Sequence, residues 1–186
     1  MTVGRVVPVL NIIKDRSTNM YRVLITDDEK IEREGIKFLL AQEEGEYEIH
    51  EAANGRQALN VLRSEEIDFL LTDIKMPHMD GLELASKVRE EYPNLPIVIF
   101  SGYSDFAFAQ EAMRYGVKDY VLKPVDPDTF HTTIGKVKAE LQSIRSKKQK
   151  EEKSTKIDSQ LYIIIRQQKR NEVSICRDLL MIQIIS

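Results

Sequence analysis

The sequence predicts an α/β protein built on a doubly wound parallel sheet of five strands with five helices. Short apolar runs alternate five times with longer amphipathic stretches, which is the pattern of successive βαβ units. The central runs are apolar enough for strands that helices cover on both faces. Polar or charged residues follow the ends of these runs, where parallel sheets place their binding sites.

The first two strands are each followed by an amphipathic helix. After the first strand, Asp28-Glu29 opens a helix whose apolar residues Ile31, Ile36, Leu39 and Leu40 are expected on one face. After the second strand, Asn54-Gly55 precedes a helix carrying Ala58, Leu59, Val61 and Leu62. The five expected strands are Tyr21–Thr26, Tyr47–Ala52, Ile67–Thr72, Ile97–Phe100 and Lys118–Leu122.

The last three helices carry recognisable start or stop signals. Asp80-Gly81 opens the third, with Leu82, Ala85 and Val88 facing inward. The fourth covers about Asp105–Tyr115, and Gly116 ends it. Asp126-Pro127-Asp128 caps the fifth, because acidic side chains accept from free backbone N–H groups and proline tolerates the first turn. The apolar residues of this helix form a heptad-like stripe: Phe130, Ile134, Val137, Leu141 and Ile144.

Composition excludes several classes of protein. The 186 residues are 42% hydrophobic, enough for one well-packed domain, and a net charge of −3 indicates neither nucleic acid nor membrane as a partner. The single cysteine, Cys176, cannot form an internal disulfide and is interpreted as a small apolar residue rather than a reactive thiol. No apolar run approaches the roughly 18 residues of a membrane span. We therefore expect a cytoplasmic protein.

The domain pattern does not fill the chain. Residues 1–19 precede it and are predicted to be an N-terminal extension, whereas residues 20–145 form the domain. Residues 146–186 are predicted to be a charged linker and an incomplete C-terminal segment, too short for an independent domain.

Acidic and basic residues at separate strand ends predict one ion-binding site. Asp27-Asp28 follows the first strand, Asp73 the third, Ser101 the fourth and Lys123 the fifth. Converging carboxylates repel one another unless a cation lies between them, and Mg²⁺ suits oxygen ligands together with a phosphate. Lys123 can pair with phosphate as a point charge. No cysteine–histidine spacing supports zinc, and no glycine-rich nucleotide loop is present.

These residues, in this order and on these strand ends, resemble the receiver domain of two-component response regulators. The supporting stretches are Val23–Glu29, Asp73–Gly81 and Lys118–Pro124. The resemblance covers roughly residues 21–145 and implies a flavodoxin-like sheet of strand order 2-1-3-4-5. Two further stretches, Phe100–Phe106 and Ala112–Gly116, look most like receivers that precede AraC-type helix-turn-helix output domains.

The resemblance also implies roles for individual residues. Asp73 would accept a phosphoryl group from a phosphohistidine of a sensor histidine kinase. Asp28, Asp73 and the backbone carbonyl of Lys75 would hold Mg²⁺, with Asp27 acting mainly through a metal-bound water. Lys123 and the Ser101 hydroxyl would bind the phosphoryl oxygens, and Tyr120 would be the switch aromatic that turns inward. The Lys123–Pro124 bond would be cis, which an X–Pro bond permits.

The resemblance further implies slow self-dephosphorylation, tuned by Lys75 and Tyr103, rather than an enzyme that turns over a substrate. The surface around the fourth helix, the fifth strand and the fifth helix is expected to bind a second copy or a partner, through Ala107, Ala112, Met113, Tyr115 and Tyr120. Control of transcription would require a DNA-binding output domain, which we expect to be absent or truncated here because residues 157–186 are too few.

Simpler interpretations of the same residues remain open. Asp28 could be only a helix N-cap, Asp73 a turn residue, Ser101 a turn hydroxyl and Tyr120 an ordinary strand aromatic. Two other functions also remain: a Mg²⁺-dependent aspartyl phosphatase of the haloacid dehalogenase type, and a phosphate-independent interaction domain. The first needs an Asp-x-Asp pair after the first strand, whereas this chain has adjacent Asp27 and Asp28.

Overall fold

A computed structural model describes residues 20–102 and 106–147 of the chain. The expectations for residues 1–19, Tyr103 and residues 148–186 lie outside this description. The chain divides into two compact units, Met1–Val137 and Lys138–Ser186, and the sheet belongs to the first. None of the helices in the described ranges has the length and apolar character needed to span a membrane.

Five parallel strands form one sheet in the order β2-β1-β3-β4-β5, which confirms the predicted topology. Their carboxyl ends lie at one edge: Thr26 pairs with both Ala52 and Thr72, and Ser101 pairs with Leu122. Side chains at the ends of the first, third, fourth and fifth strands can therefore meet at one site. The strands are β1 (Met20–Thr26), β2 (Glu46–Ala52), β3 (Phe69–Asp73), β4 (Ile97–Ser101) and β5 (Asp119–Leu122).

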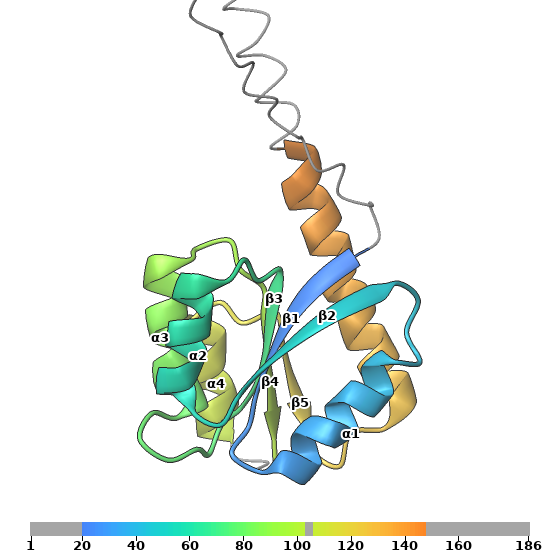
Figure 1. The fold of residues 1–186 in the computed structure, drawn as a ribbon. Coiled ribbons are helices and arrows are strands. Elements are labelled where there is room, and N and C mark those ends of the chain that lie inside the picture. The colour runs from blue at the N-terminus through green and yellow to red at the C-terminus, as the bar shows by residue number, and fades with distance from the viewer. Residues whose placement is uncertain (1–19, 103–105, 148–186) are drawn as a thin grey trace, which may run out of the picture. The chain divides into compact units, whose positions relative to one another are not determined.

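Helices cover both faces of this sheet (Figure 1). On one face lie α2 (Gly55–Ser64), α3 (Gly81–Glu91) and α4 (Phe106–Arg114). On the other lie α1 (Lys30–Leu40) and the first turns of a fifth helix over residues 127–147. Phe130 of that helix stacks on Phe100 of β4 at 6.1 Å between ring centroids. Burial on both faces explains why the inner strands have no polar alternation.

Several predicted helix ends are confirmed. Asn54 and Asp80 are N-caps whose side chains accept from the backbone N–H groups of Gln57 and Glu83. Asp126 accepts in the same way from Thr129 N. Gly116 ends α4 with a φ of +66°, a conformation that a side chain disfavours.

Two predicted faces are wrong in one residue each. Ile31 is 74% exposed, whereas Ile36 and Leu40 of the same helix are buried. Five residues at about 100° each place Ile31 far around the helix from Ile36, so they do not share a face. Ala112 is fully buried in the core cluster, so it cannot belong to the proposed partner surface.

Candidate functional site

The predicted site residues Asp27, Asp73 and Lys123 meet at the carboxyl edge of the sheet. The Lys123 Nζ lies 2.8 Å from Asp27 Oδ2 and 2.9 Å from Asp73 Oδ1. A third carboxylate, Glu32 of α1, approaches the same ammonium at 3.4 Å. Residues up to 96 positions apart in sequence thus share one ion-pair cluster.

Asp73 is the last residue of β3, and its side chain is held at the mouth of the site. Its Oδ2 accepts a hydrogen bond of 2.7 Å from Lys75 N, and the side chain is 12% exposed. Burial raises the pKa of the Asp73 carboxyl; Lys123 opposes this shift and Asp27 adds to it. The carboxylate is therefore held in an environment that favours a loss of its charge.

The start of α3 lies directly against the Asp73 backbone. Gly81 N donates to Ile74 O at 2.8 Å, and a Cβ built on Gly81 would lie 2.0 Å from Asp73 O. No side chain fits at this distance, so glycine is required for the helix to begin here. The Asp80-Gly81 pair thus supplies both the cap and the close approach.

Asp27 and Asp28 have different surroundings. Asp27 is 2% exposed, and its Oδ1 accepts from Glu29 N at 2.9 Å. Asp28 is exposed, and the N-cap position of α1 is Glu29, with no side-chain capping hydrogen bond. The alternative interpretation of Asp28 as a helix N-cap is therefore wrong, and its carboxylate remains available at the site.

Lys123 is positioned by the backbone on either side of it. Its N–H donates to Ser101 O at 2.8 Å, and the Lys123–Pro124 bond is cis, as expected. Burial acts to lower the pKa of Lys123, but the hydrogen bonds and charges of Asp27 and Asp73 outweigh it and raise that pKa. The ammonium is therefore firmly charged at neutral pH.

Ser101 and Tyr120 lie on the neighbouring strands β4 and β5. Ser101 is completely buried at the end of its strand. Tyr120 pairs with Ile99, two residues before Ser101, and packs half-buried against the core cluster. Tyr120 therefore lies on the strand next to that of Ser101, close to the same end of the sheet.

The donors at this edge fit a divalent cation. Asp27, Asp28, Asp73 and Glu32 supply four negative charges, and Lys123 balances one of them. Within residues 20–102 and 106–147, no three acidic, histidine or cysteine side chains form a ready-made metal cage. Mg²⁺ sites usually take only one or two carboxylates and keep several waters.

Sequence reasoning missed Glu32 and Arg33 of α1. Arg33 donates to Asp27 O at 2.7 Å and to Glu51 Oε2 at 2.8 Å. Lys75 Nζ also lies 4.8 Å from the centre of the Phe108 ring of α4. The helical spacing from Asp28 and Glu29 could have placed Glu32 and Arg33 on the side facing the acidic pair.

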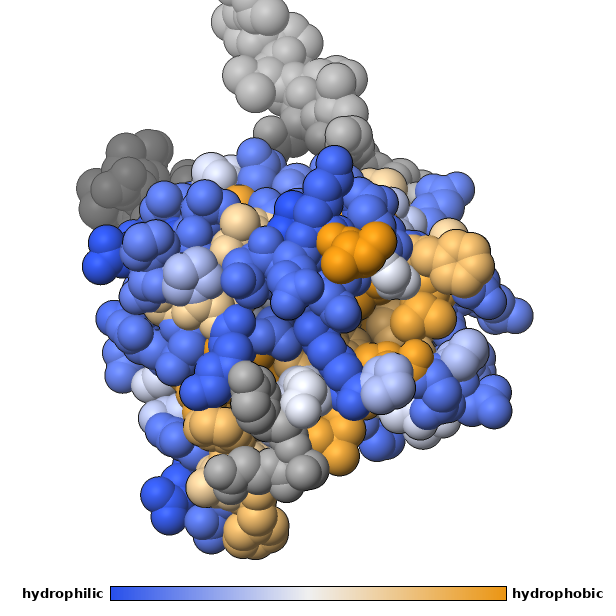
Figure 2. Space-filling model, turned by 90° about the horizontal axis from the view of Figure 1, so that it is seen from below, coloured by the Kyte–Doolittle hydropathy of each residue, from blue (hydrophilic) through white to orange (hydrophobic). Residues whose placement is uncertain are grey.

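A groove of about 580 Å³ borders the site. It lies between α1 and the segment that follows β5, and Gly35, Ile36 and Pro124 line it together with Lys123. Figure 2 looks onto this end of the molecule and shows a mainly hydrophilic surface, with hydrophobic side chains gathered on the right, over α1. Ile31 and Phe38 of α1 are 74% and 70% exposed.

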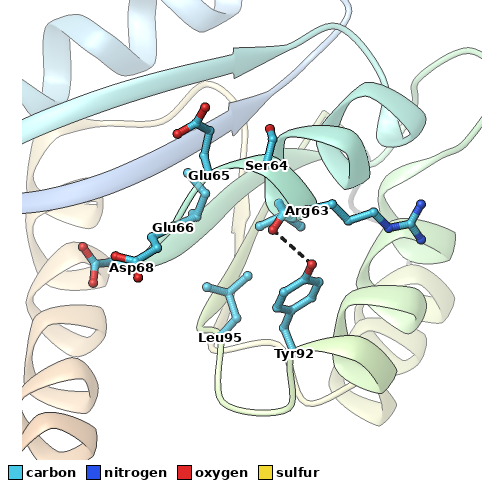
Figure 3. A pocket seen from close by; sticks show the side chains of 9 residues that line it. Arg63, Ser64, Glu65, Glu66, Asp68, Tyr92 and Leu95 are labelled. Atoms are coloured by element: carbon cyan, nitrogen blue, oxygen red, sulfur yellow. Dashed lines mark hydrogen bonds between the residues drawn. The ribbon is translucent and has the colours of Figure 1, made fainter.

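A second depression, of about 550 Å³, lies at the opposite end of the strands (Figure 3). Three of its residues already have polar partners: Tyr92 Oη donates to Leu62 O, Asp68 accepts from Arg22 N, and Arg63 pairs with Glu91. Arg63 points away from the hollow, as Figure 3 shows. We therefore place the chemistry at the carboxyl edge.

Most of the described domain matches one protein family. The sequence model of the family described as the response regulator receiver domain matches residues 23–135. This chain belongs to that family. The receiver of AraT, a response regulator from Geobacillus stearothermophilus, is 40% identical with a TM-score of 0.61, covering 67% of this chain and 98% of that one. The predicted resemblance and the fold class are confirmed.

The receiver also resembles regulators of transcription. It is 38% identical over 132 residues to the uncharacterized transcriptional regulatory protein YesN of Bacillus subtilis, covering 69% of this chain and 36% of that protein. It is 33% identical to the transcriptional regulatory protein HptR of Staphylococcus aureus, covering 63% of this chain and 46% of HptR. The chain thus spans less than half the length of these two relatives.

One structural relative carries a ligand. The response regulator TrrA of Thermotoga maritima, crystallised in complex with Mg²⁺ and beryllium fluoride, is 32% identical with a TM-score of 0.57. The match covers 63% of this chain and 99% of that one.

Proposed function

We propose that this receiver is a phosphorylation switch in which Asp73 accepts a phosphoryl group from a sensor histidine kinase. The observation that carries the proposal is the Lys123 ammonium between Asp27 and Asp73, 2.8 and 2.9 Å from their carboxylates. Asp73 is reachable at the rim, whereas Asp27 is enclosed. Of the two carboxylates that pair with Lys123, Asp73 is therefore the one that an incoming phosphoryl donor can reach.

Mg²⁺ is the cation that this donor set fits. Asp28, Asp73 and the Lys75 backbone carbonyl would hold it, with Asp27 contributing through a bound water. Bound there, the metal would offset the negative charge that gathers on a transferring phosphoryl group.

In the transfer itself, an Asp73 oxygen forms a bond to phosphorus as the bond from phosphorus to the kinase imidazole nitrogen breaks. The product is an acyl phosphate. Lys123 is already charged and close, so it can pair with the new phosphoryl oxygens without a change of protonation. The Ser101 hydroxyl would become the second partner by turning toward the phosphate.

The response would pass from Ser101 to Tyr120 and then to the surface. Tyr120 would turn inward as Ser101 moves, which shifts the population of two forms of the α4–β5 region. Water would then remove the phosphate slowly, so the chain acts as a timed switch and not as an enzyme with turnover. Control of transcription would follow through an output region, as the names of YesN and HptR suggest.

The direct test is phosphorylation by a small donor. Purified protein incubated with Mg²⁺ and phosphoramidate should gain the mass of one phosphoryl group, measured by intact mass spectrometry. Asp73→Asn should gain none, and removal of Mg²⁺ with a chelator should abolish the reaction of the wild type. The exposed residue Asp128 provides a matched control, because Asp128→Asn should react like the wild type.

The proposal fails if the wild type gains no phosphoryl group or if Asp73→Asn gains one as well. Sustained hydrolysis of a phosphate ester by the wild type would instead favour the aspartyl phosphatase. If phosphoramidate phosphorylates the wild type, transfer from the labelled phosphohistidine of a sensor kinase would extend that result to the physiological donor.

A further inference from the structure

Arg33 of α1 bridges two parts of the chain next to the acidic pair. Its Nη1 donates to Asp27 O at 2.7 Å, and its Nε donates to Glu51 Oε2 of β2 at 2.8 Å. The Arg33 side chain is only 14% exposed. A guanidinium can serve two acceptors at once because its donors form a rigid planar fork.

The Asp27 carbonyl needs such a partner. Asp27 N still donates to Ala52 O of β2, but the last paired residue of β1 is Thr26. The carbonyl that follows has therefore left the sheet ladder, and a partly buried carbonyl without a donor costs free energy. Arg33 supplies the donor.

This contact also sets the direction of Asp28. The Asp27 carbonyl and the Asp28 N–H belong to one planar peptide unit, so fixing the carbonyl fixes how the chain enters Asp28. In the part of the chain that the structure describes, no side-chain hydrogen bond or ion pair holds the Asp28 carboxylate. Its placement thus depends on the backbone alone.

We infer that Arg33 is a positioning residue that holds the Asp27–Asp28 peptide in the orientation needed for cation binding by Asp28. The inference rests on the proposed function. Glu51 keeps the guanidinium in place, and Arg33 and Lys37 together lower the pKa of the Glu51 carboxyl, with Lys37 the larger cause. Glu51 is therefore a charged anchor at neutral pH.

The direction of the change in Mg²⁺ affinity distinguishes a positioning role of Arg33 from an effect of its charge. Arg33 is positive and lies beside a cation site, so loss of its charge alone should strengthen Mg²⁺ binding. Loss of positioning should weaken it. Arg33→Ala should bind Mg²⁺ about tenfold more weakly than the wild type in isothermal titration calorimetry, as is usual for residues that orient metal ligands.

Lys37→Ala is the matched control. Lys37 pairs with the same Glu51 at 2.8 Å from the next turn of α1, but it does not contact Asp27 O. Its variant should keep Mg²⁺ affinity within about twofold of the wild type. Arg33→Lys keeps the charge without the fork and should also bind more weakly, which preserves the test if Arg33→Ala does not fold.

Phosphorylation by phosphoramidate gives a second readout. In Arg33→Ala the Mg²⁺ concentration for half-maximal rate should rise about tenfold, while the rate at saturating Mg²⁺ stays within about threefold. Wild-type Mg²⁺ affinity in either Arg33 variant, or an equal loss in Lys37→Ala, would overturn the inference. A wild type that binds no Mg²⁺ would instead refute the proposed function.

Discussion

At the scale of single residues, Asp73 combines access with an unfavourable charge. Burial raises its carboxyl pKa despite the nearby Lys123. The protonated form therefore stabilises the fold at pH values below about 4, and this contribution is lost as the pH rises through the folded-state pKa. At neutral pH the ionised Asp73 carboxylate therefore lowers the free energy of unfolding. A bound divalent cation, or transfer of a phosphoryl group to Asp73, can offset this loss.

This predicts a stability gain when the charge is removed. Asp73→Asn should be more stable than the wild type at pH 7 by about 1 kcal/mol, within the usual range for one substitution. The difference should shrink toward pH 3, where Asp73 is protonated. Urea unfolding followed by circular dichroism, without Mg²⁺, measures both values, and a less stable Asp73→Asn at pH 7 would contradict the interpretation.

Lys75 is the second residue whose effect can be predicted. Its N–H binds Asp73, and its ammonium lies over the Phe108 ring, so the side chain extends between the site and α4. We expect it to limit the access of water to the acyl phosphate. Lys75→Ala should therefore shorten the phospho-Asp73 half-life by about threefold or more, since water exclusion protects reactive intermediates.

The half-life is measured by the decay of the phosphorylated mass after removal of the donor. Lys87→Ala is a control, because Lys87 pairs only with Glu83 across one turn of α3 among the contacts described. An unchanged half-life in Lys75→Ala would show that Lys75 does not limit the access of water to the acyl phosphate.

At the scale of elements, two glycines in helices differ in the space around them. Gly81 lets α3 begin against the Asp73 carbonyl, where a Cβ would lie 2.0 Å from the oxygen. Gly35, inside α1, has nothing within 4 Å of the position that a Cβ would take, so no close approach requires glycine there. The start of α3 is thus built for contact, whereas Gly35 keeps the middle of α1 open toward the groove beside Lys123.

The two substitutions should therefore differ in sign. Gly81→Ala should destabilise the protein by about 1–3 kcal/mol through overpacking, and Gly35→Ala should stabilise it by about 0.5–1 kcal/mol through helix propensity. Thermal and urea unfolding of both variants at neutral pH provide the comparison. Equal effects in the same direction would show that the space around Gly81 can relax.

At the scale of the whole molecule, exposed apolar side chains identify the surface that we expect to respond. Phe106 and Met113 of α4 are 78% and 54% exposed, and Leu122 of β5 is 48% exposed. These residues replace the buried Ala112 in the predicted partner surface. A contiguous exposed apolar patch is typical of an interaction site, and we predict that these three residues contribute to one.

We predict that beryllium fluoride with Mg²⁺ shifts the protein from monomer toward dimer, measured by sedimentation velocity. Met113→Glu should weaken that dimer at least about tenfold, because a charge would be buried in the interface. Ile31→Ser removes an apolar residue of α1 that is even more exposed, and this variant should dimerise like the wild type. Dimerisation of Met113→Glu at wild-type affinity would place the interface elsewhere.

The sequence by itself determined the strands, most helix ends and the residues at the carboxyl edge. These features follow from local rules: apolar runs form strands, Asp and Asn cap helices, and parallel strands end together. Asp27, Asp73 and Lys123 could therefore be assigned to one site from the sequence, without their distances. The identity of Asp80 and Gly116 as end signals came from the same local chemistry.

Only the tertiary structure decided which side chains meet across that edge. The bridge of Arg33 to Asp27 O, the approach of Glu32 to Lys123 and the exposure of Ile31 depend on how α1 rotates against β1 and β2. The same holds for Ala112, which packs inward because α4 rests on the sheet. Helical periodicity shows which face of a helix is most apolar, but the packing of one element against another decides which side chains are buried.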